Sequence, residues 1–261
     1  MDFISPLLRI RIVLVETSHP GNMGAAARAM KTMGITRLFL VRPKTLPDKH
    51  SDAMAAGAAD VLANAVICAN LDDALTGSVL AVAVTARRRD LSHPSMDARC
   101  AAVQAIVDAG QGEVALVFGP EMSGLSNEDV LKCQRIAHIP VDADFSSLNL
   151  AAAVQVVCYE LRMAAGLAEL PAGSESPLAT FEEVERFYQH MEKTLTEIRF
   201  LNADHPMRLM TRVRRIFGRM RMEREEVQIL RGVLKMISRA VRHENAERAK
   251  PAKPASTSSA E

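Results

Sequence analysis

The strongest constraint on the fold of this 261-residue chain is an alternation of short apolar runs with helical patterns between residue 9 and about residue 165. Six runs have the length and β-branched content of strands: IRIVLVE, RLFLVRP, NAVICA, VLAVAVTA, EVALVFG and RIAHIP. Because such continuously apolar strands need cover on both faces, the alternation predicts an α/β domain with a mainly parallel sheet flanked by helices.

Helical patterns fill the intervals between these runs. We expect helices at Asn22 to Met33, Ser51 to Leu62, Asp72 to Leu75, Met96 to Ala109, Asn127 to Cys133 and Ser147 to Leu167. Ser126, followed three residues later by Asp129, has the spacing of a capping box, and Ser51 and Asp72 are candidate caps of their helices.

The strand pattern stops at a segment rich in Gly, Pro and Ser, GLAELPAGSESPLAT, which predicts a linker. Beyond it, apolar residues recur at helical spacing after Thr180, a candidate N-cap. Two further helices are expected at about Pro206 to Phe217 and Arg224 to Val241. The main domain is therefore followed by a small all-α extension.

These patterns divide the chain into a main domain at 1–165, a linker at 166–180, a helical extension at 181–243 and a tail at 244–261. The tail lacks apolar side chains to bury, which predicts disorder. Between Arg199 and Lys250 the chain carries fourteen basic and six acidic residues, a net charge of +8, although the whole chain carries only +1. Such asymmetry is typical of a segment that meets a polyanion.

Other features exclude several classes of protein. No run of about 18 uncharged apolar residues is present, so a membrane span is not expected. The N-terminus lacks the pattern of a signal peptide, and we place the protein in the cytoplasm. The four cysteines, at positions 68, 100, 133 and 158, are far apart and form no C-x-x-C, so we expect buried free thiols and no structural metal.

Three loops follow expected strands, at the sheet edge where open α/β folds bind their ligands. The first contains Asn22 and Arg28, the second places Gly119 and Gly124 around Glu121, and the third is IPVDADFSSLNLAAAVQV. Taken singly, Asn22 could cap its helix, Arg28 could form a surface ion pair and Glu121 could lie in a solvated turn. No loop is a G-x-G-x-x-G, which argues against a nicotinamide-dependent oxidoreductase.

Taken together, NMGAAARAM, FGPEMSGLSNE and SSLNLAAAVQVVCYE resemble, in this order and spacing, the three motifs of the SpoU branch of the SPOUT RNA methyltransferases. The opening RIVLVETSHPGNMGAAARAMKTMG, the TAR at Thr85 to Arg87 and the helical extension are most similar to the members that methylate the tRNA anticodon loop. The resemblance is strong over residues 9 to 165 and looser over the extension. One departure is Pro120, where relatives commonly carry a basic residue; a proline removes both a charge and a backbone N–H.

The resemblance implies a SPOUT fold with a C-terminal trefoil knot, at about residues 116–162. It also implies S-adenosylmethionine as cofactor, bound in a bent form against the knot loops. The implied cofactor-binding residues are Thr85, Ala86, Arg87, Phe118, Gly119, Glu121, Ile139, Ser147, Leu148 and Asn149.

The implied reaction is methylation of a ribose 2'-hydroxyl in tRNA, at C or U in position 32. The resemblance assigns activation of this hydroxyl to the arginine of the first motif, here Arg28. Because arginine stays protonated in proteins, we expect Arg28 to stabilise the developing alkoxide and hold a phosphate. Asn22, Glu121 and Asn149 would orient it and the ribose. The residues expected to contact RNA are Arg28, Arg87, Arg212, Arg215 and Arg219.

Family members are homodimers whose active site is completed across the interface, so Arg28 serves either its own cofactor site or that of the partner. tRNA is the expected partner, and neither a metal nor a membrane is implied. Two alternatives stay open: a 2'-O-methyltransferase acting on ribosomal RNA, and a non-catalytic RNA-binding relative.

Overall fold

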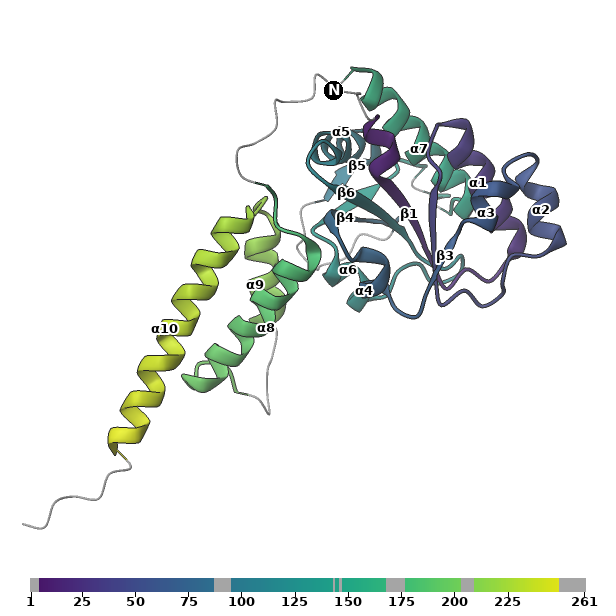
Figure 1. Ribbon diagram of the computed structural model, residues 1–261. Coiled ribbons are helices and arrows are strands. Elements are labelled where there is room, and N and C mark those ends of the chain that lie inside the picture. Colours follow the sequence, from purple (N-terminus) through teal and green to yellow (C-terminus); the bar gives the residue numbers. More distant parts are fainter. Residues whose placement is uncertain are drawn as a thin grey trace, which may run out of the picture.

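The computed structural model describes residues 5–86, 95–142, 144–145, 147–167, 177–202 and 209–248. Figure 1 shows an α/β domain with its sheet between helices, and a separate group of helices beside it. The strands are β1 (Ile10–Val15), β2 (Arg37–Val41), β3 (Val66–Cys68), β4 (Ser78–Val84), β5 (Ser95–Asp97), β6 (Glu113–Phe118) and β7 (Arg135–His138). The helices are η1 (Pro6–Arg9), α1 (Pro20–Thr32), α2 (Lys49–Ala55), α3 (Ala59–Ala63), α4 (Leu71–Leu75), α5 (Ala98–Ala109), α6 (Asn127–Lys132), α7 (Leu150–Leu167), α8 (Phe181–Glu197), α9 (Leu209–Gly218) and α10 (Arg224–Arg248).

The described strands form one sheet in the order β3-β2-β1-β6-β4-β7-β5, and every neighbouring pair is parallel. All six residues of β1 are buried, as a central strand covered on both faces requires. Ile12 and Leu14 pack with α1, α5 and α7, whereas Val13 and Val15 pack with α4 and α6. Side chains alternate across a strand, so one apolar run supplies two cores. The predicted parallel α/β domain is confirmed.

The helix expected at Ser51 to Leu62 is divided into α2 and α3. After α2 the chain passes through Ala56 at φ 42° and Gly57 at φ 91°, and such left-handed residues end a helix. The expected cap was also wrong, because Asp48 caps α2 and accepts a hydrogen bond from Ser51 N at 2.9 Å. Ser51 Oγ accepts in return from Asp48 N at 2.7 Å, so Ser51 is the third helical residue of a capping box rather than its first member.

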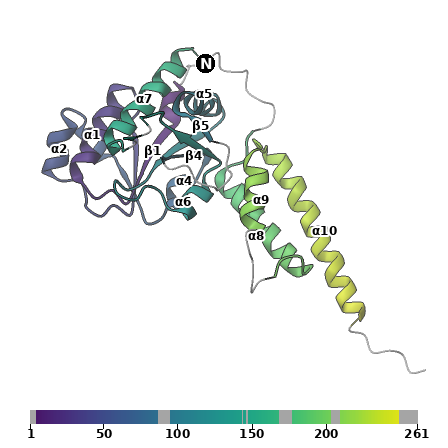
Figure 2. The ribbon, with the colours of Figure 1, turned by 180° about the vertical axis from the view of Figure 1, so that it is seen from behind.

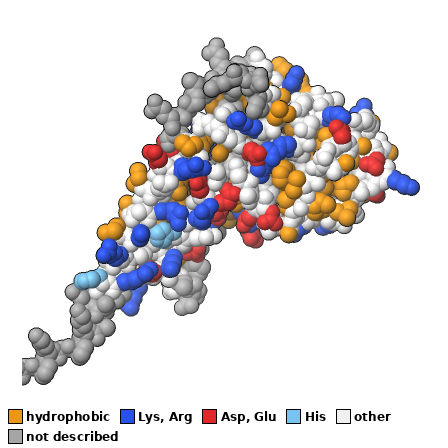
Figure 3. Space-filling view, viewed as in Figure 1, with side chains coloured by type: hydrophobic (Ala, Val, Ile, Leu, Met, Phe, Trp, Pro, Cys, Tyr) orange, Lys and Arg blue, Asp and Glu red, His pale blue; other side chains and the backbone are white. Residues whose placement is uncertain are grey.

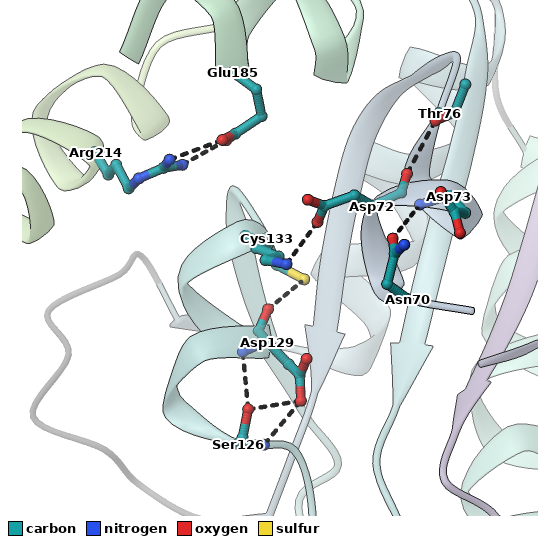
Figure 4. A network of polar contacts seen from close by, with 10 residues as sticks. Asn70, Asp72, Asp73, Thr76, Ser126, Asp129, Cys133, Glu185 and Arg214 are labelled. Atoms are coloured by element: carbon teal, nitrogen blue, oxygen red, sulfur yellow. Dashed lines mark hydrogen bonds and ion pairs between the residues drawn. The ribbon is translucent and has the colours of Figure 1, made fainter. Parts of the chain in front are cut away.

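Capping residues also define the starts of the short helices α4 and α6, which lie on the same face of the sheet (Figure 4). The capping box predicted at Ser126 and Asp129 is present at the start of α6. Asn70, and not Asp72, caps α4, because its Oδ1 accepts a backbone N–H of the first turn at 2.9 Å. Asp72 instead pairs with Lys132 Nζ at 2.6 Å and ties α4 to α6.

The sequence pattern did not predict β5. This strand has three residues and pairs with β7 at the edge of the sheet, and its sequence Ser-Met-Asp carries no strand signature. The helix expected from Met96 therefore begins at Ala98, where the side chain of Asp97 accepts a hydrogen bond from Cys100 N at 2.7 Å.

Three of the four cysteines are buried, as expected, but Cys100 is exposed in the first turn of α5. Burial raises the pKa of the Cys158 thiol to about 12, so this thiol stays protonated at neutral pH. Cys158 therefore acts as a small apolar residue of the core.

The helical extension has a core of its own. Its buried members are Ala179, Val184, Phe187, Tyr188, Met222, Val227 and Leu234. α10 continues to Arg248, so the helix runs past residue 244, where the tail was predicted to begin. Residues 249–261 and most of the predicted linker lie outside the described residues. Within the described part of the chain, no helix is long and apolar enough to span a bilayer.

The extension is attached near the N-terminal ends of the strands. Phe181, the first residue of α8, is buried in the core beneath the sheet with α4 and α6. Glu182 accepts a hydrogen bond at 2.8 Å from the backbone N–H of Gly77, which immediately precedes β4. Figures 1 and 2 show, from opposite sides, that α8 lies near the sheet domain while α10 extends away from it.

A cluster of charged residues around the buried Asp108 completes this attachment. Arg135, the first residue of β7, donates hydrogen bonds to the backbone carbonyls of Gly218 and Arg219 after α9. The carboxylate of Asp108, near the end of α5, pairs with Arg221. Burial raises the pKa of Asp108 although the nearby arginines oppose this effect. The extension thus rests on groups at the end of the strands that does not carry the three motif loops.

Candidate active site

A cavity of about 280 Å³ lies at the C-terminal ends of β4, β6 and β7. It brings together eight of the residues expected to bind cofactor: Thr85, Ala86, Phe118, Gly119, Glu121, Ile139, Ser147 and Leu148. Asn149 is not among its lining residues, and Arg87 lies outside the described residues. The second and third motif loops therefore meet at one cavity, at the carboxyl ends of the parallel strands.

The loop of residues 119–125 owes its shape to two glycines. A Cβ atom on Gly119 would lie 2.1 Å from Leu125 N and 2.4 Å from the carbonyl carbon of Gly124, so no larger residue fits. Gly124 has φ +65° and donates its N–H to Pro120 O at 2.9 Å. The loop folds back tightly on itself and forms one wall of the cavity.

Glu121 links the second motif loop to the first. Its carboxylate accepts hydrogen bonds from Ser18 N at 3.2 Å, Ser18 Oγ at 3.0 Å, His19 N at 3.3 Å and Asn22 Nδ2 at 2.9 Å. Asn22 Oδ1 in turn accepts from Asn149 Nδ2 at 3.0 Å, which brings in the third loop. Asn22 thus joins two side chains that lie 99 and 127 residues further along the chain, and the three form one hydrogen-bonded chain.

The charge state of Glu121 follows from these contacts. Partial burial opposes ionisation, but the hydrogen bonds from Asn22 and Ser18 together outweigh it and hold the pKa of Glu121 below its usual value. The carboxylate is therefore ionised at neutral pH. Asn22 does not cap α1, since the N-cap is His19, whose Nδ1 accepts from Gly21 N at 3.2 Å.

Arg28 is not brought into this cluster. It lies six residues beyond Asn22 on α1, about 9 Å along the helix axis, and does not line the cavity. Its side chain is exposed, and it makes no hydrogen bond or ion pair with any described residue. One chain alone therefore does not combine all four predicted catalytic residues in one place.

Comparison with known families divides the chain at the same point as the structure does. Residues 9–159, more than half of the chain, match the SpoU rRNA Methylase family. The chain belongs to the SpoU methylase family. Residues 182–246 match a second family, described as the C-terminal domain of the tRNA methyltransferase TrmJ.

Similar proteins cover almost the whole of this SpoU family member. The tRNA (cytidine/uridine-2'-O-)-methyltransferase TrmJ of Escherichia coli K12 is 47% identical over 246 residues, which are 92% of this chain and 100% of that protein. The crystal structure of TrmJ from Z. mobilis ZM4 superposes with a TM-score of 0.76 at 31% identity, over 87% of this chain and 98% of that one. A probable methylase family protein from Haemophilus influenzae Rd KW20 has a TM-score of 0.59 at 39% identity, over 91% of this chain and 99% of its own. The predicted SPOUT fold is confirmed.

The basic residues of the SpoU chain's extension differ in accessibility. Arg212 is exposed on α9, Arg215 is half-buried, and Arg219 is exposed. Arg219 lies just beyond α9, which ends at Gly218. Arg214 is held by Glu185 (Figure 4). It also lies over the ring of Tyr188, 4.5 Å away, so it serves the core of the extension. Figure 3 shows that basic side chains gather over the extension.

Sequence reasoning missed several residues of the SpoU site. Ser18 and His19 contact Glu121, and Val84, Met122 and Val141 are among the further residues that line the cavity. Four of them lie within the three motif loops and Val84 directly precedes the expected Thr85, so proximity to the expected residues was the available signal. Residue type gave none, because Ser, Val and Met are common in any loop or strand.

Proposed function

We propose that this chain transfers a methyl group from S-adenosylmethionine to the ribose 2'-hydroxyl of cytidine or uridine in tRNA. Its 47% identity to the E. coli enzyme over 92% of the chain supports both the reaction and the substrate. The match of residues 182–246 to a tRNA methyltransferase domain supports tRNA independently. The structural observation that carries the proposal is the hydrogen-bonded chain Glu121–Asn22–Asn149, which begins in the wall of the cavity.

The cavity suits this cofactor by its chemistry. Val84, Phe118, Ile139 and Leu148 offer apolar walls to an adenine ring. The ionised Glu121 supplies negative charge that complements a sulfonium cation. When bound, the cofactor supplies a methyl group already activated on sulfur, so the chain itself must bind, orient and shield the reactants.

We assign cofactor binding to the residues that the motifs single out and that the cavity or its hydrogen-bonded border contains. They are Thr85, Ala86, Phe118, Gly119, Glu121, Ile139, Ser147, Leu148 and Asn149. Arg87 remains a prediction, since it lies outside the described residues.

Glu121 positions the first loop rather than acting as a base. Its two oxygens accept four hydrogen bonds, and its lowered pKa makes the carboxylate a weak proton acceptor. Asn22 is fixed in one orientation, because its amide nitrogen faces Glu121 and its amide oxygen faces Asn149. These contacts hold the start of α1 against the cofactor loop, where a ribose must be aimed for in-line transfer.

We further propose a homodimer in which Arg28 serves the cofactor cavity of the partner subunit. Its distance from the cavity of its own chain and its lack of a partner among the described residues support this arrangement. A guanidinium at the partner's site would stabilise the negative charge that develops on the ribose oxygen and hold an adjacent phosphate. Arg28 acts there as a fixed cation and not as a general base.

Substitution of Arg28 tests this role. In Arg28→Ala we expect kcat to fall by roughly 100-fold or more, as for loss of one preorganised charge stabiliser, with cofactor affinity unchanged. Lys31→Ala is the matched control, because Lys31 lies on the same helix and pairs with Asp60. Full activity of Arg28→Ala would contradict the assignment.

Mixing two inactive variants tests the dimer. A heterodimer of Arg28→Ala with Gly119→Ala contains one complete site if Arg28 acts across the interface, and none if it acts within its own chain. We expect the mixture to regain part of the native activity, measured as methyl transfer to tRNA. A mixture that stays inactive, or an active native enzyme that sediments as a monomer, would overturn the shared site.

The nucleotide that is methylated must be identified by mapping the modification in the RNA. We propose position 32 of the anticodon loop, and Arg212, Arg215 and Arg219 as phosphate contacts for the tRNA. Ribosomal RNA is the second candidate substrate, because the matching family is described as rRNA methylases. Transfer of labelled methyl to bulk tRNA and to ribosomal RNA, followed by mapping of the modified nucleotide, separates the two.

Methylation confined to position 32 would support the full proposal. Methylation of ribosomal RNA alone would favour the second candidate, and no transfer to either RNA would point to a non-catalytic RNA-binding protein. We also propose that the catalytic domain spans residues 1–165, that its knot lies within about residues 116–162, and that the enzyme works in the cytoplasm.

A further inference from the structure

A second cavity lies beside the cofactor loop and has no assigned role. It measures about 390 Å³, within the range of pockets that hold small molecules. Pro120, Ser123 and Gly124 line both this cavity and the cofactor cavity, so the two are separated by the loop of residues 119–125. The remaining lining residues include Glu16 and Arg42, which follow β1 and β2.

Glu16 and Arg42 form a preorganised pair in this cavity. Arg42 Nε and Nη2 lie 3.2 Å and 3.1 Å from the same oxygen, Glu16 Oε1, and the two side chains are 42% and 39% exposed. Both residues have left-handed backbones, with φ +50° for Glu16 and +44° for Arg42. Non-glycine residues rarely adopt this conformation, and the strain persists where the surrounding structure holds it. Backbone hydrogen bonds from Glu16 N to Val41 O at 2.8 Å and from Arg42 N to Cys68 O at 3.0 Å do so here.

Contacts connect this pair to the active site. Lys44 N donates to Thr17 O at 3.0 Å, and Thr45 Oγ1 donates to Ser18 O at 3.1 Å. Ser18 in turn donates to Glu121, the centre of the three-loop cluster. A ligand in the second cavity would therefore touch the segment that positions the first motif loop.

We propose that this second cavity binds a nucleotide that flanks the methylated one, with its base against the Arg42–Glu16 pair and its phosphate near Arg42 and the exposed Lys44. The inference rests on the proposed function, because it takes RNA as the substrate. Nucleotides of a single-stranded loop have unstacked bases that proteins hold on flat side chains such as the arginine guanidinium. A guanidinium also pairs with phosphate, and a carboxylate accepts hydrogen bonds from the amino groups of bases.

This arrangement explains why a charged pair under backbone strain lies next to the cofactor loop. A neighbouring nucleotide held in the second cavity leaves the first cavity free for the cofactor. It also places the ribose of the adjacent target nucleotide near the loop of residues 119–125, which separates the two cavities. It also gives the enzyme a contact to RNA at a distance from the basic helices of the extension.

The test uses the full-length enzyme and a methyl-accepting tRNA. In Arg42→Ala we expect the KM for tRNA to rise about tenfold, the effect of losing one stacked base, with cofactor Kd and melting temperature unchanged. Arg42→Lys keeps the charge but loses the flat guanidinium, so its KM should lie between the native and Arg42→Ala values. Lys31→Ala, on the exposed face of α1, is the control and should leave KM unchanged.

A second arm identifies the occupant. Anticodon stem-loops with an abasic nucleotide on one or the other side of the target remove the proposed base while keeping the phosphate. We expect one of them to raise KM for the native enzyme and to have little further effect in Arg42→Ala, because both changes remove the same contact.

Three results overturn the inference. The first is an unchanged KM for tRNA in Arg42→Ala, and the second is that the abasic nucleotide and the Arg42→Ala substitution raise KM additively. The third is that Arg42→Ala also weakens cofactor binding. The last would show that Arg42 supports the loop and does not hold RNA. A native enzyme that methylates no tRNA would refute the proposed function as well, whereas an active native enzyme with unaffected variants refutes only the second cavity.

Discussion

The two ends of the parallel strands are built for different tasks. At the N-terminal end, Glu113 of β6 pairs with Arg11 of β1 and Arg37 of β2, and Arg11 also donates to the carbonyl of Ala74 at 2.9 Å. At the other end of β6, Phe118 leads into the cofactor loop, where Met122 is 92% exposed. These charges at the first end pair within the chain, whereas the second end carries the cavity of the second and third motif loops and the exposed Met122.

The difference shows how one sheet separates attachment from chemistry. The extension docks through Asp108, Arg135 and Gly77, all near the start of strands or the end of the preceding helix. The motif loops follow the carboxyl ends of the same strands, where parallel sheets gather their ligands. Substitutions at the two ends should therefore separate loss of stability from loss of activity.

Gly119→Ala should have the largest effect, a loss of activity at the carboxyl end of the strands. A Cβ at this position would lie 2.1 Å from backbone, so the loop must move, and we expect cofactor binding to weaken and activity to fall by roughly 100-fold or more. Gly166→Ala is the control, because among the described residues no atom beyond its own stretch of α7 lies within 4 Å of its Cβ position. Methyl transfer and cofactor Kd measure the effect, and native activity of Gly119→Ala would show that the loop is not rigid.

Asp108→Ala should weaken the docking of the extension and lower the stability of the fold, while cofactor binding at the other end of the strands stays unchanged. Loss of the buried carboxylate leaves Arg221 without its partner, and we expect the free energy of unfolding to fall by about 2 kcal/mol. Asp60→Ala removes an exposed ion pair with Lys31 that water screens, so it should cost much less stability than Asp108→Ala. Urea unfolding measures both, and a change in cofactor Kd for Asp108→Ala would contradict the separation of the two ends.

Glu121→Gln should reveal a pH-dependent contribution at the cofactor end. The folded-state pKa of Glu121 lies below its ordinary value of 4.5, so its ionised form stabilises the fold at all pH values above this range. At neutral pH we expect the native chain to be more stable than the variant by on the order of 1 kcal/mol. The difference should vanish as the pH falls through the folded-state pKa. Urea titrations at decreasing pH check the sign, and a gap that widens in acid would refute it.

Arg212→Ala should have the smallest effect, on tRNA affinity alone, and should change neither the stability of the fold nor cofactor binding. Arg212 is exposed on α9, and loss of one phosphate contact should reduce the slope of log affinity for tRNA against log salt by about 0.9. Lys31→Ala should leave the slope unchanged, since Lys31 lies on α1 of the other domain. Filter binding over a range of salt concentrations measures the slope, and an unaltered slope would place the tRNA elsewhere.

Several features could be predicted because their signals are local. The apolar runs at Ile10–Val15 and Glu113–Phe118 indicated strands, and Ser126 with Asp129 indicated a helix start. β5 could not be predicted, because three polar or flexible residues become a strand only when β7 lies beside them. Ser51 was taken as a cap because residue type alone does not distinguish the first from the last member of a capping box.

The sequence by itself determined the family, the three motif loops and the basic character of the extension, because motif order, glycine positions and charge are properties of the linear chain. Only the tertiary structure decided that Asn22 and Asn149 meet Glu121, that Arg28 lies away from them, and that the extension docks at the opposite end of the strands. The reason is physical. Residues about a hundred positions apart become neighbours through the order in which strands pair, and that order depends on how the whole core packs.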